Sequence, residues 1–219
     1  MTDHFARPRS STWLLGALLV LLAPIGGGCS GDQGSEEPAA GSLSATTAAQ
    51  LEGLYEITSH FEDPAGCGAG AAVEDGPAYL VAVAAEFLGI QTLSLVSCRD
   101  QTECADFAEA IRGMSIYMGF DFNFTISEQR SPSELSGFLA TTGYGDDAGM
   151  CTERTYESII LTVDGSGGIA IDDEVMALAD RPQDAEGYCV VEPDQSRRDA
   201  EGAPCVSHVS VTATRVGDI

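Results

Sequence analysis

Lysine is absent from this sequence of 219 residues: all ten basic residues are arginines, against 34 acidic residues. The formal net charge is therefore −24 at pH 7. A surface of that sign repels nucleic acid and attracts cationic partners, so we expect no nucleic-acid partner. Histidine is scarce as well, since only His60 and His208 lie beyond the first few residues. No two cysteines have the Cys-x-x-Cys spacing, and the chain predicts no metal site and no cofactor.

A long hydrophobic run is also missing. Residues 13–25 are mostly apolar and follow a positively charged start that contains Arg7 and Arg9. A transmembrane helix needs about 20 apolar residues, so this shorter run predicts the core of a signal peptide. Three glycines at 26–28 and then Cys29 come next, an arrangement that resembles the lipobox of bacterial lipoproteins.

The lipobox resemblance implies that residues 1–28 are a lipoprotein signal peptide and that Cys29 is diacylated. The acylated Cys29 would bind membrane lipid and anchor the chain in the cell envelope, in the outer membrane if the host is Gram-negative. The alternative is an ordinary signal peptide cleaved at the same small residues, which would give a secreted or periplasmic protein.

The chain has seven cysteines, an odd number that is awkward in an exported protein. If Cys29 carries lipid, six remain, and these can form three disulfides in an oxidising compartment. Nearness in the sequence favours two of the pairs, and the third follows by elimination. The expected pairs are Cys98 with Cys104, Cys189 with Cys205, and Cys67 with Cys151.

Residues 29–48 are rich in Ser, Gly and Glu and have little to bury, so they predict a flexible tether. Residues 49–219 predict a single disulfide-stabilised domain. Its clearest pattern is a period of two over residues 114–126, which is typical of a strand. This row would line an apolar pocket if the domain encloses one, or else fill a dry core. The pocket candidates are Met114, Ile116, Met118, Phe120, Phe122 and Phe124.

Further strands are predicted at residues 53–61, 79–87, 90–97, 135–144, 151–163, 169–178, 188–191 and 206–216. One short helix is predicted at residues 101–112, where Asp100 can cap the start. Strands that follow one another through short turns favour a mainly β fold, an antiparallel up-and-down β-barrel of about nine strands. A β-sandwich is the alternative.

The two ends of this domain resemble those of lipocalins and the wider calycin group. Those proteins open with Gly-x-Trp on the first strand and place an arginine near the chain end across that ring. This chain has Gly53-Leu-Tyr55 and Thr214-Arg215-Val216. The resemblance implies a lipocalin-like barrel with Tyr55 and Arg215 together at one end, and it implies no ligand.

Two patterns invite a chemical interpretation. The loop at residues 164–168 resembles the nucleophile segment of chymotrypsin-type proteases, but its Gly-rich composition is that of a hairpin turn, and we interpret it so. Acidic clusters at residues 146–147, 172–174 and 194–201 are interpreted as solvated loops, because calcium needs about six to eight converging oxygens.

No catalytic motif is present, and we expect a non-enzymatic binding module for an apolar ligand inside the barrel or for a cationic protein at its surface. One alternative is a structural or envelope-interaction lipoprotein without a small ligand. The other is a hydrolase.

Overall fold

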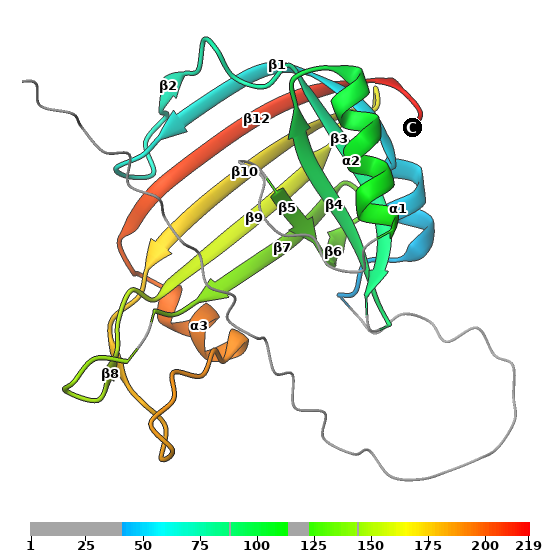
Figure 1. Ribbon diagram of the computed structural model, residues 1–219. Helices are drawn as coiled ribbons and strands as arrows, with labels where there is room; N and C mark the ends of the chain where they lie inside the picture. The colour runs from blue at the N-terminus through cyan, green and yellow to red at the C-terminus, as the bar shows by residue number, and fades with distance from the viewer. Residues whose placement is uncertain (1–40, 88, 114–122, 144) are drawn as a thin grey trace, which may run out of the picture. The chain divides into compact units, whose positions relative to one another are not determined.

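The computed structural model describes residues 41–87, 89–113, 123–143 and 145–219. Its strands are antiparallel, and the main sheet curls into a nearly closed barrel (Figure 1). The predicted mainly β barrel is confirmed. The strands are β1 Gly53–Asp63, β2 Ala71–Ala72, β3 Tyr79–Phe87, β4 Ile90–Cys98, β5 Asn123–Ile126, β6 Glu128–Ser131, β7 Glu134–Thr141, β8 Met150–Cys151, β9 Thr155–Val163, β10 Gly168–Ala177, β11 Arg181–Pro182 and β12 Cys205–Gly217. The helices are α1 Ala45–Leu51, α2 Gln101–Gly113 and α3 Pro193–Ala200.

The connectivity is up-and-down. The order in the sheet is β5-β4-β3-β1-β12-β10-β9-β7-β6, with β2 added to β1, so the first and last long strands pair with each other. The two edge strands, β5 and β6, are consecutive in the chain and are separated only by Ser127. The Ser127 amide donates a hydrogen bond of 3.0 Å to the Ser136 carbonyl in β7. The ring of strands therefore closes where β5 turns into β6.

Closure brings β5 and β7 unusually close together at Gly137. A Cβ atom built on Gly137 would overlap the carbonyl oxygen of Thr125 in β5. Only glycine leaves room for two backbones at that distance. Gly137 therefore sets how tightly the barrel can close.

The barrel interior is an aliphatic core to which α1 also contributes. We call the end where β1 begins and β12 finishes the α1 end, because Ala48 and Leu51 of α1 belong to the core cluster there. Leu43 is also buried, at 2% exposure. The domain therefore begins before residue 49, and the expected boundary of the tether at residue 48 is wrong.

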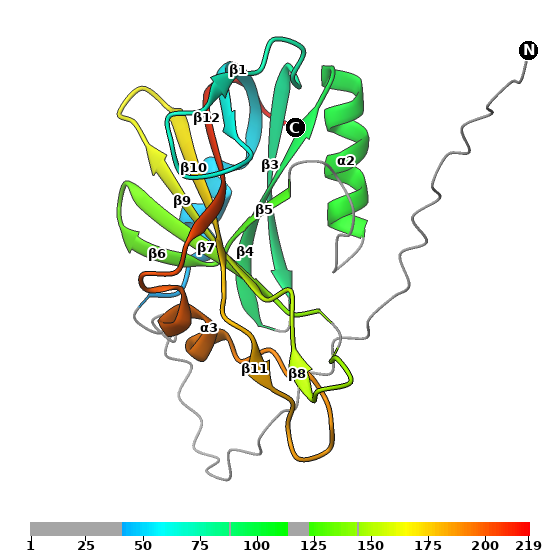
Figure 2. The same cartoon turned by 90° about the vertical axis from the view of Figure 1, so that its left-hand side faces the viewer.

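A second apolar cluster lies on the outer face of β3 and β4, where α2 packs (Figure 2). Cys104, Ala108 and Ile111 form the buried stripe of α2. Asp100 caps this helix by accepting the amides of Thr102 and Glu103, each at 2.9 Å. The predicted helix is thus confirmed. No helix in the described part of the chain is long and apolar enough to span a membrane.

The sequence predicts neither α1 nor α3, and one predicted strand is absent. Because α3 covers most of residues 194–201, the interpretation of that acidic segment as a loop is wrong. Helix α1 falls in the expected tether, and α3 has a proline near its start and almost no buried residue, so neither shows an apolar stripe in the sequence. Residues 188–191 form no strand. Residues 151–163 split into the end of β8 and the separate strand β9.

The described residues form three disulfides. Cys98 at the end of β4 bonds Cys104 in α2, as its short spacing predicts. The other two expected pairings are wrong. The structure instead pairs Cys67 with Cys205 and Cys151 with Cys189.

Two strand pairings, β1 with β12 and β8 with β11, explain the disulfides that form. Cys205 begins β12, and because β12 runs antiparallel to β1, it lies beside the loop after β1 that carries Cys67. Cys189 follows β11, which pairs with β8 and so with Cys151. Helix α3 intervenes between Cys189 and Cys205. Strand pairing, and not nearness in the sequence, decides which cysteines meet.

Candidate functional site

The inner face of the barrel changes from apolar to charged along its strands. On β10, Ile169 and Ile171 point into the core, and the period of two places Asp173 on that same inner face. On β9, Ile159 and Leu161 point inward, and Glu157 shares their face. Both carboxyl side chains lie toward the end opposite α1, where β10 finishes and β9 begins.

Strand register brings a second pair of titratable residues to this region. Glu62 of β1 and Asp173 of β10 are both paired with Val209 of β12, one on each side of it. His60 is paired with Val211, the inward residue one step closer to α1. We call the inward residues His60, Glu62, Glu157 and Asp173 the acidic end of the barrel.

Asp173 is the most unusual of the four. Its exposure is only 7%, and its Oδ1 atom has no hydrogen-bond partner among the residues that the structure describes. Burial raises the pKa of Asp173 to about 7, and the negative charges of Glu157, Asp172 and Glu174 add to that rise, while His208 opposes it. At neutral pH this carboxyl is poised between its protonated and charged forms.

Glu157 lies next to Asp173 on the neighbouring strand. It is paired with Val175 on β10 and with Leu139 on β7. Burial raises the pKa of the Glu157 carboxyl. Leu139 is 53% exposed, so the barrel reaches solvent beside Glu157.

His60 and Glu62 are in contact, with Nε2 and Oε1 3.0 Å apart. The histidine side chain is 4% exposed and the glutamate side chain 41%, so the pair runs from the interior to the surface. The loop after β1 covers His60. Val73 donates its amide to the His60 carbonyl at 3.0 Å, and a Cβ on Gly76 would lie 2.8 Å from His60 Nδ1.

On the outer face, His208 of β12 binds Asp172 of β10. Its Nε2 lies 2.5 Å from Asp172 Oδ1, and its Nδ1 lies 2.8 Å from the Gly68 carbonyl. The hydrogen bond with Asp172 raises the pKa of His208. This pair ties two strands and the Cys67 loop together outside the barrel.

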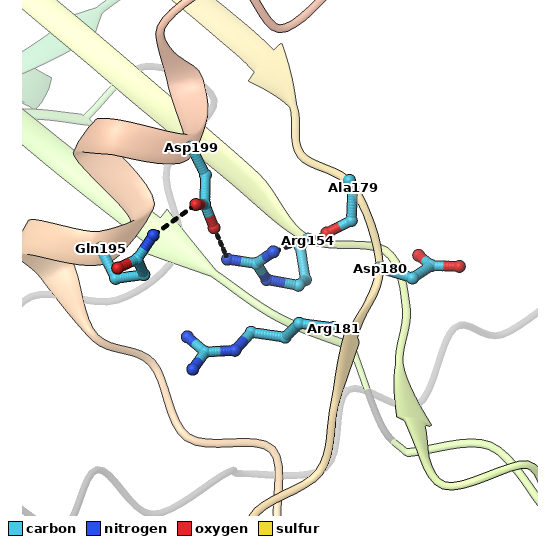
Figure 3. Close-up of a pocket in the computed structure, with 6 residues that line it drawn as sticks. All are labelled: Arg154, Ala179, Asp180, Arg181, Gln195 and Asp199. Carbon is cyan, nitrogen blue, oxygen red and sulfur yellow. Dashed lines mark hydrogen bonds and ion pairs between the residues drawn. The ribbon is translucent and has the colours of Figure 1, made fainter.

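A separate pocket of about 350 Å³ lies between α3 and the segments that flank β9 and β11 (Figure 3). Arg154, which is 5% exposed, donates hydrogen bonds to the Ala179 carbonyl and to Asp199 Oδ2, at 2.5 and 2.7 Å. Gln195 donates to the other Asp199 oxygen at 2.6 Å. The bond from Arg154 lowers the pKa of Asp199. Arg154 and Asp199 satisfy each other and fasten α3 to the barrel, while the Nη1 atom of Arg181 in the same pocket has no hydrogen-bond partner among the described residues.

The residues of the lipocalin resemblance lie opposite each other at the α1 end. Tyr55 and Arg215 are register partners, and the Tyr55 hydroxyl donates to the Leu51 carbonyl at 2.8 Å. Arg215 donates to the carbonyls of Gln50 and Glu52 at 2.8 and 2.6 Å. Together they fasten the end of α1 to the first and last strands of the barrel.

The other predicted site residues are not placed. Cys29 and the pocket row Met114, Ile116, Met118, Phe120 and Phe122 lie outside the described residues, as does the side chain of Phe124. The backbone of Phe124 belongs to β5 and pairs with Leu95.

The hairpin interpretation of residues 164–168 is confirmed. Asp164 Oδ1 accepts the amides of Ser166 and Gly168 and the Ser166 hydroxyl, and Gly167 adopts a φ of +87°. The side chains of Asp164 and Ser166 are thus used in the hydrogen bonds of the turn that joins β9 to β10.

The interpretation of residues 172–174 as a solvated loop is wrong, since all three lie within β10. The sequence contains the signal that identifies Asp173: it follows Ile169 and Ile171 at a spacing of two.

No group of three or more histidine, cysteine or acidic side chains in the described ranges is arranged to hold a metal ion. No protein-family model, no curated protein and no solved structure matches this chain.

Proposed function

We propose that this chain is an exported, lipid-anchored binding protein of the cell envelope, whose barrel takes up a small molecule at its acidic end. The observation that carries the proposal is Asp173, a carboxyl turned into the barrel, buried, and without a partner for Oδ1 among the described residues. Burying a polar group without a partner costs roughly 1–3 kcal/mol. A barrel that served only as a scaffold would fill this position with an apolar side chain.

Contact with solvent also favours the acidic end of the barrel as the binding site. Helix α1 packs at the opposite end, where Tyr55 and Arg215 fasten it. At the acidic end, Leu139 and Glu62 are partly in contact with solvent, although both belong to the inward face. Polar groups that converge at an accessible end of an otherwise apolar interior are typical of small-molecule sites. The lipocalin-like order of strands is compatible with such a site but does not identify its ligand.

The anchor is supported by the cysteines. The six cysteines of the described domain all pair with one another, which leaves Cys29 as the odd one. Cys29 follows a short apolar run and three glycines, the position at which a lipoprotein precursor is acylated. The proposal is therefore a binding domain held to a membrane through a diacylated Cys29.

Both parts can be tested on the full chain purified in detergent from membranes. Denaturing mass spectrometry should retain the added mass of a diacylglyceryl group, and native spectra should show a further non-covalent mass. A Cys29→Ser chain should lose the first mass, appear in soluble fractions and keep the second. Wild-type protein that is already soluble and unmodified contradicts the anchor. A barrel that carries no extra mass and binds no compound from a panel of small molecules points to a purely structural lipoprotein.

A further inference from the structure

We infer that the molecule bound at the acidic end is an organic ammonium ion, held by Asp173 and Glu157 and taken up in exchange for a proton. This inference rests on the proposed function of the barrel.

On the inner face, the neighbour of Asp173 supplies negative charge. Glu157 projects from the adjacent strand β9 and acts on Asp173 as a negative charge, whereas Glu62 on β1 is separated from Asp173 by Val209 of β12. His60, the inward histidine of β1, is engaged with Glu62. No arginine is among the charges that influence Asp173, and the chain contains no lysine. The inner face thus gives Asp173 a neighbouring carboxyl group, Glu157, and, among the described residues, no arginine or lysine to balance it.

The outer face of the sheet does not supply a positive charge that balances Asp173 either. Asp172 and Glu174 flank Asp173 on its own strand, and both act on it as negative charges. Among the described residues, His208 is the one positive influence on Asp173, and its Nε2 is bonded to Asp172 on the outside of the sheet. A ligand that carries a positive charge would provide the counter-charge that Asp173 and Glu157 lack on the inner face.

The surroundings favour an organic cation over a metal ion. Calcium takes about six to eight oxygens at one point, and the described residues hold no such group. An ammonium group needs only one or two carboxylates. Its carbon skeleton would contact Val175, Val209 and Ile159, which share the inner face with the two carboxyls. A neutral apolar molecule would leave Asp173 as unsatisfied as before.

The exchange follows from the state of Asp173 in the empty barrel. A buried carboxyl among negative charges holds a proton until a stronger cationic partner arrives. When the ammonium binds, the carboxyl O–H bond breaks, the proton passes to solvent, and the carboxylate pairs with the ammonium. The total charge is unchanged. Because the proton competes with the ligand, apparent affinity should fall about tenfold for each pH unit below the pKa of Asp173.

Isothermal titration of the full chain carrying Cys29→Ser tests this inference. The probes are hexylammonium, its neutral counterpart 1-hexanol, and calcium, each titrated at about pH 6, 7 and 8 in two buffers of different ionisation enthalpy. Hexylammonium should bind, at least about tenfold more tightly than hexanol, with release of nearly one proton at about pH 6, about half a proton at about pH 7 and almost none at about pH 8. Calcium should not compete.

Matched variants locate the effect. Asp173→Asn should weaken hexylammonium binding at least about tenfold and abolish proton release, and Glu157→Gln should weaken it by a smaller factor. Asp172→Asn removes the same charge from the outer face of the same strand and should change affinity less than about threefold. Equal losses in Asp172→Asn and Asp173→Asn, or release of no proton, overturn the inference. If hexanol binds and hexylammonium does not, the ligand class is wrong while the binding barrel stands. If neither binds and native spectra show no ligand, the proposed function fails as well.

Discussion

Replacing Asp173 with asparagine should make the domain more stable at neutral and alkaline pH. The pKa of Asp173 is raised from 3.8 to about 7 in the folded protein, mainly by burial. Between these two values the folded state binds more protons than the unfolded state. The free energy of unfolding therefore falls as pH rises through this window, and the whole deficit is present above about pH 7. Asparagine keeps the shape of the side chain but cannot become charged.

The size of this effect follows from the shift. One pKa unit corresponds to about 1.4 kcal/mol, so a rise of roughly three units gives about 4 kcal/mol at most. Because the carboxyl keeps some contact with solvent, we expect a gain of roughly 2–4 kcal/mol for Asp173→Asn at about pH 8. At about pH 4, where wild-type Asp173 is protonated, the two proteins should differ by less than about 1 kcal/mol.

Urea unfolding with the disulfides intact, at several pH values from about 4 to 8, measures the difference directly. His208 also loses stabilisation as pH rises, since its pKa is raised in the folded state, but it is present in both proteins and cancels in the comparison. Asp147→Asn, at an exposed loop residue, is the control and should change stability by less than about 0.5 kcal/mol. If wild type and Asp173→Asn show the same pH dependence, Asp173 is stably paired in the fold, and its role as an unsatisfied acid is refuted.

Four further predictions concern other parts of the structure. Gly137→Ala should destabilise by at least about 2 kcal/mol in thermal unfolding, because the new Cβ overlaps the backbone of β5; an unchanged melting temperature contradicts the closure described here. Arg215→Ala should cost more than the roughly 0.5 kcal/mol of an ordinary surface change, since two carbonyls of the α1 segment lose their donor, and urea unfolding measures this. Asp172→Asn should lower the pKa of His208 in an NMR titration, and no movement would mean that the hydrogen bond between them does not form in solution. Peptide mapping without reduction should recover Cys67 bonded to Cys205, and any other partner for Cys67 contradicts the strand register at that end.

The sequence predicts most of the barrel strands because the alternation of apolar and polar residues within a strand shows which of its faces is buried. Strand β3 has the expected bounds, and β10 differs from its expected range by a single residue at each end. The sequence does not predict the two short helices, because α1 is too brief to show a helical period and α3 is polar on every side. It does not predict two of the disulfides for another reason. Their pairing depends on which strand ends meet after closure, and this is a long-range property that spacing along the chain does not contain.

The candidate site was within reach of the sequence. The strand around residues 169–178 was predicted, and its period of two already puts Asp173 on the face of Ile169 and Ile171. The position of Glu157 beside Asp173, and of Glu62 two strands away, could not be predicted, because it depends on the registers of β1, β12, β10 and β9 together.

The most direct test of the central claim is a carbon-detected NMR titration of the Asp173 carboxyl with and without saturating hexylammonium. In the empty barrel the midpoint should lie near 7. With the ammonium bound it should fall by at least about one pH unit, because the cation stabilises the charged carboxylate. A midpoint that stays near 7 in the presence of bound hexylammonium would show that Asp173 does not hold the ligand, and would contradict the account.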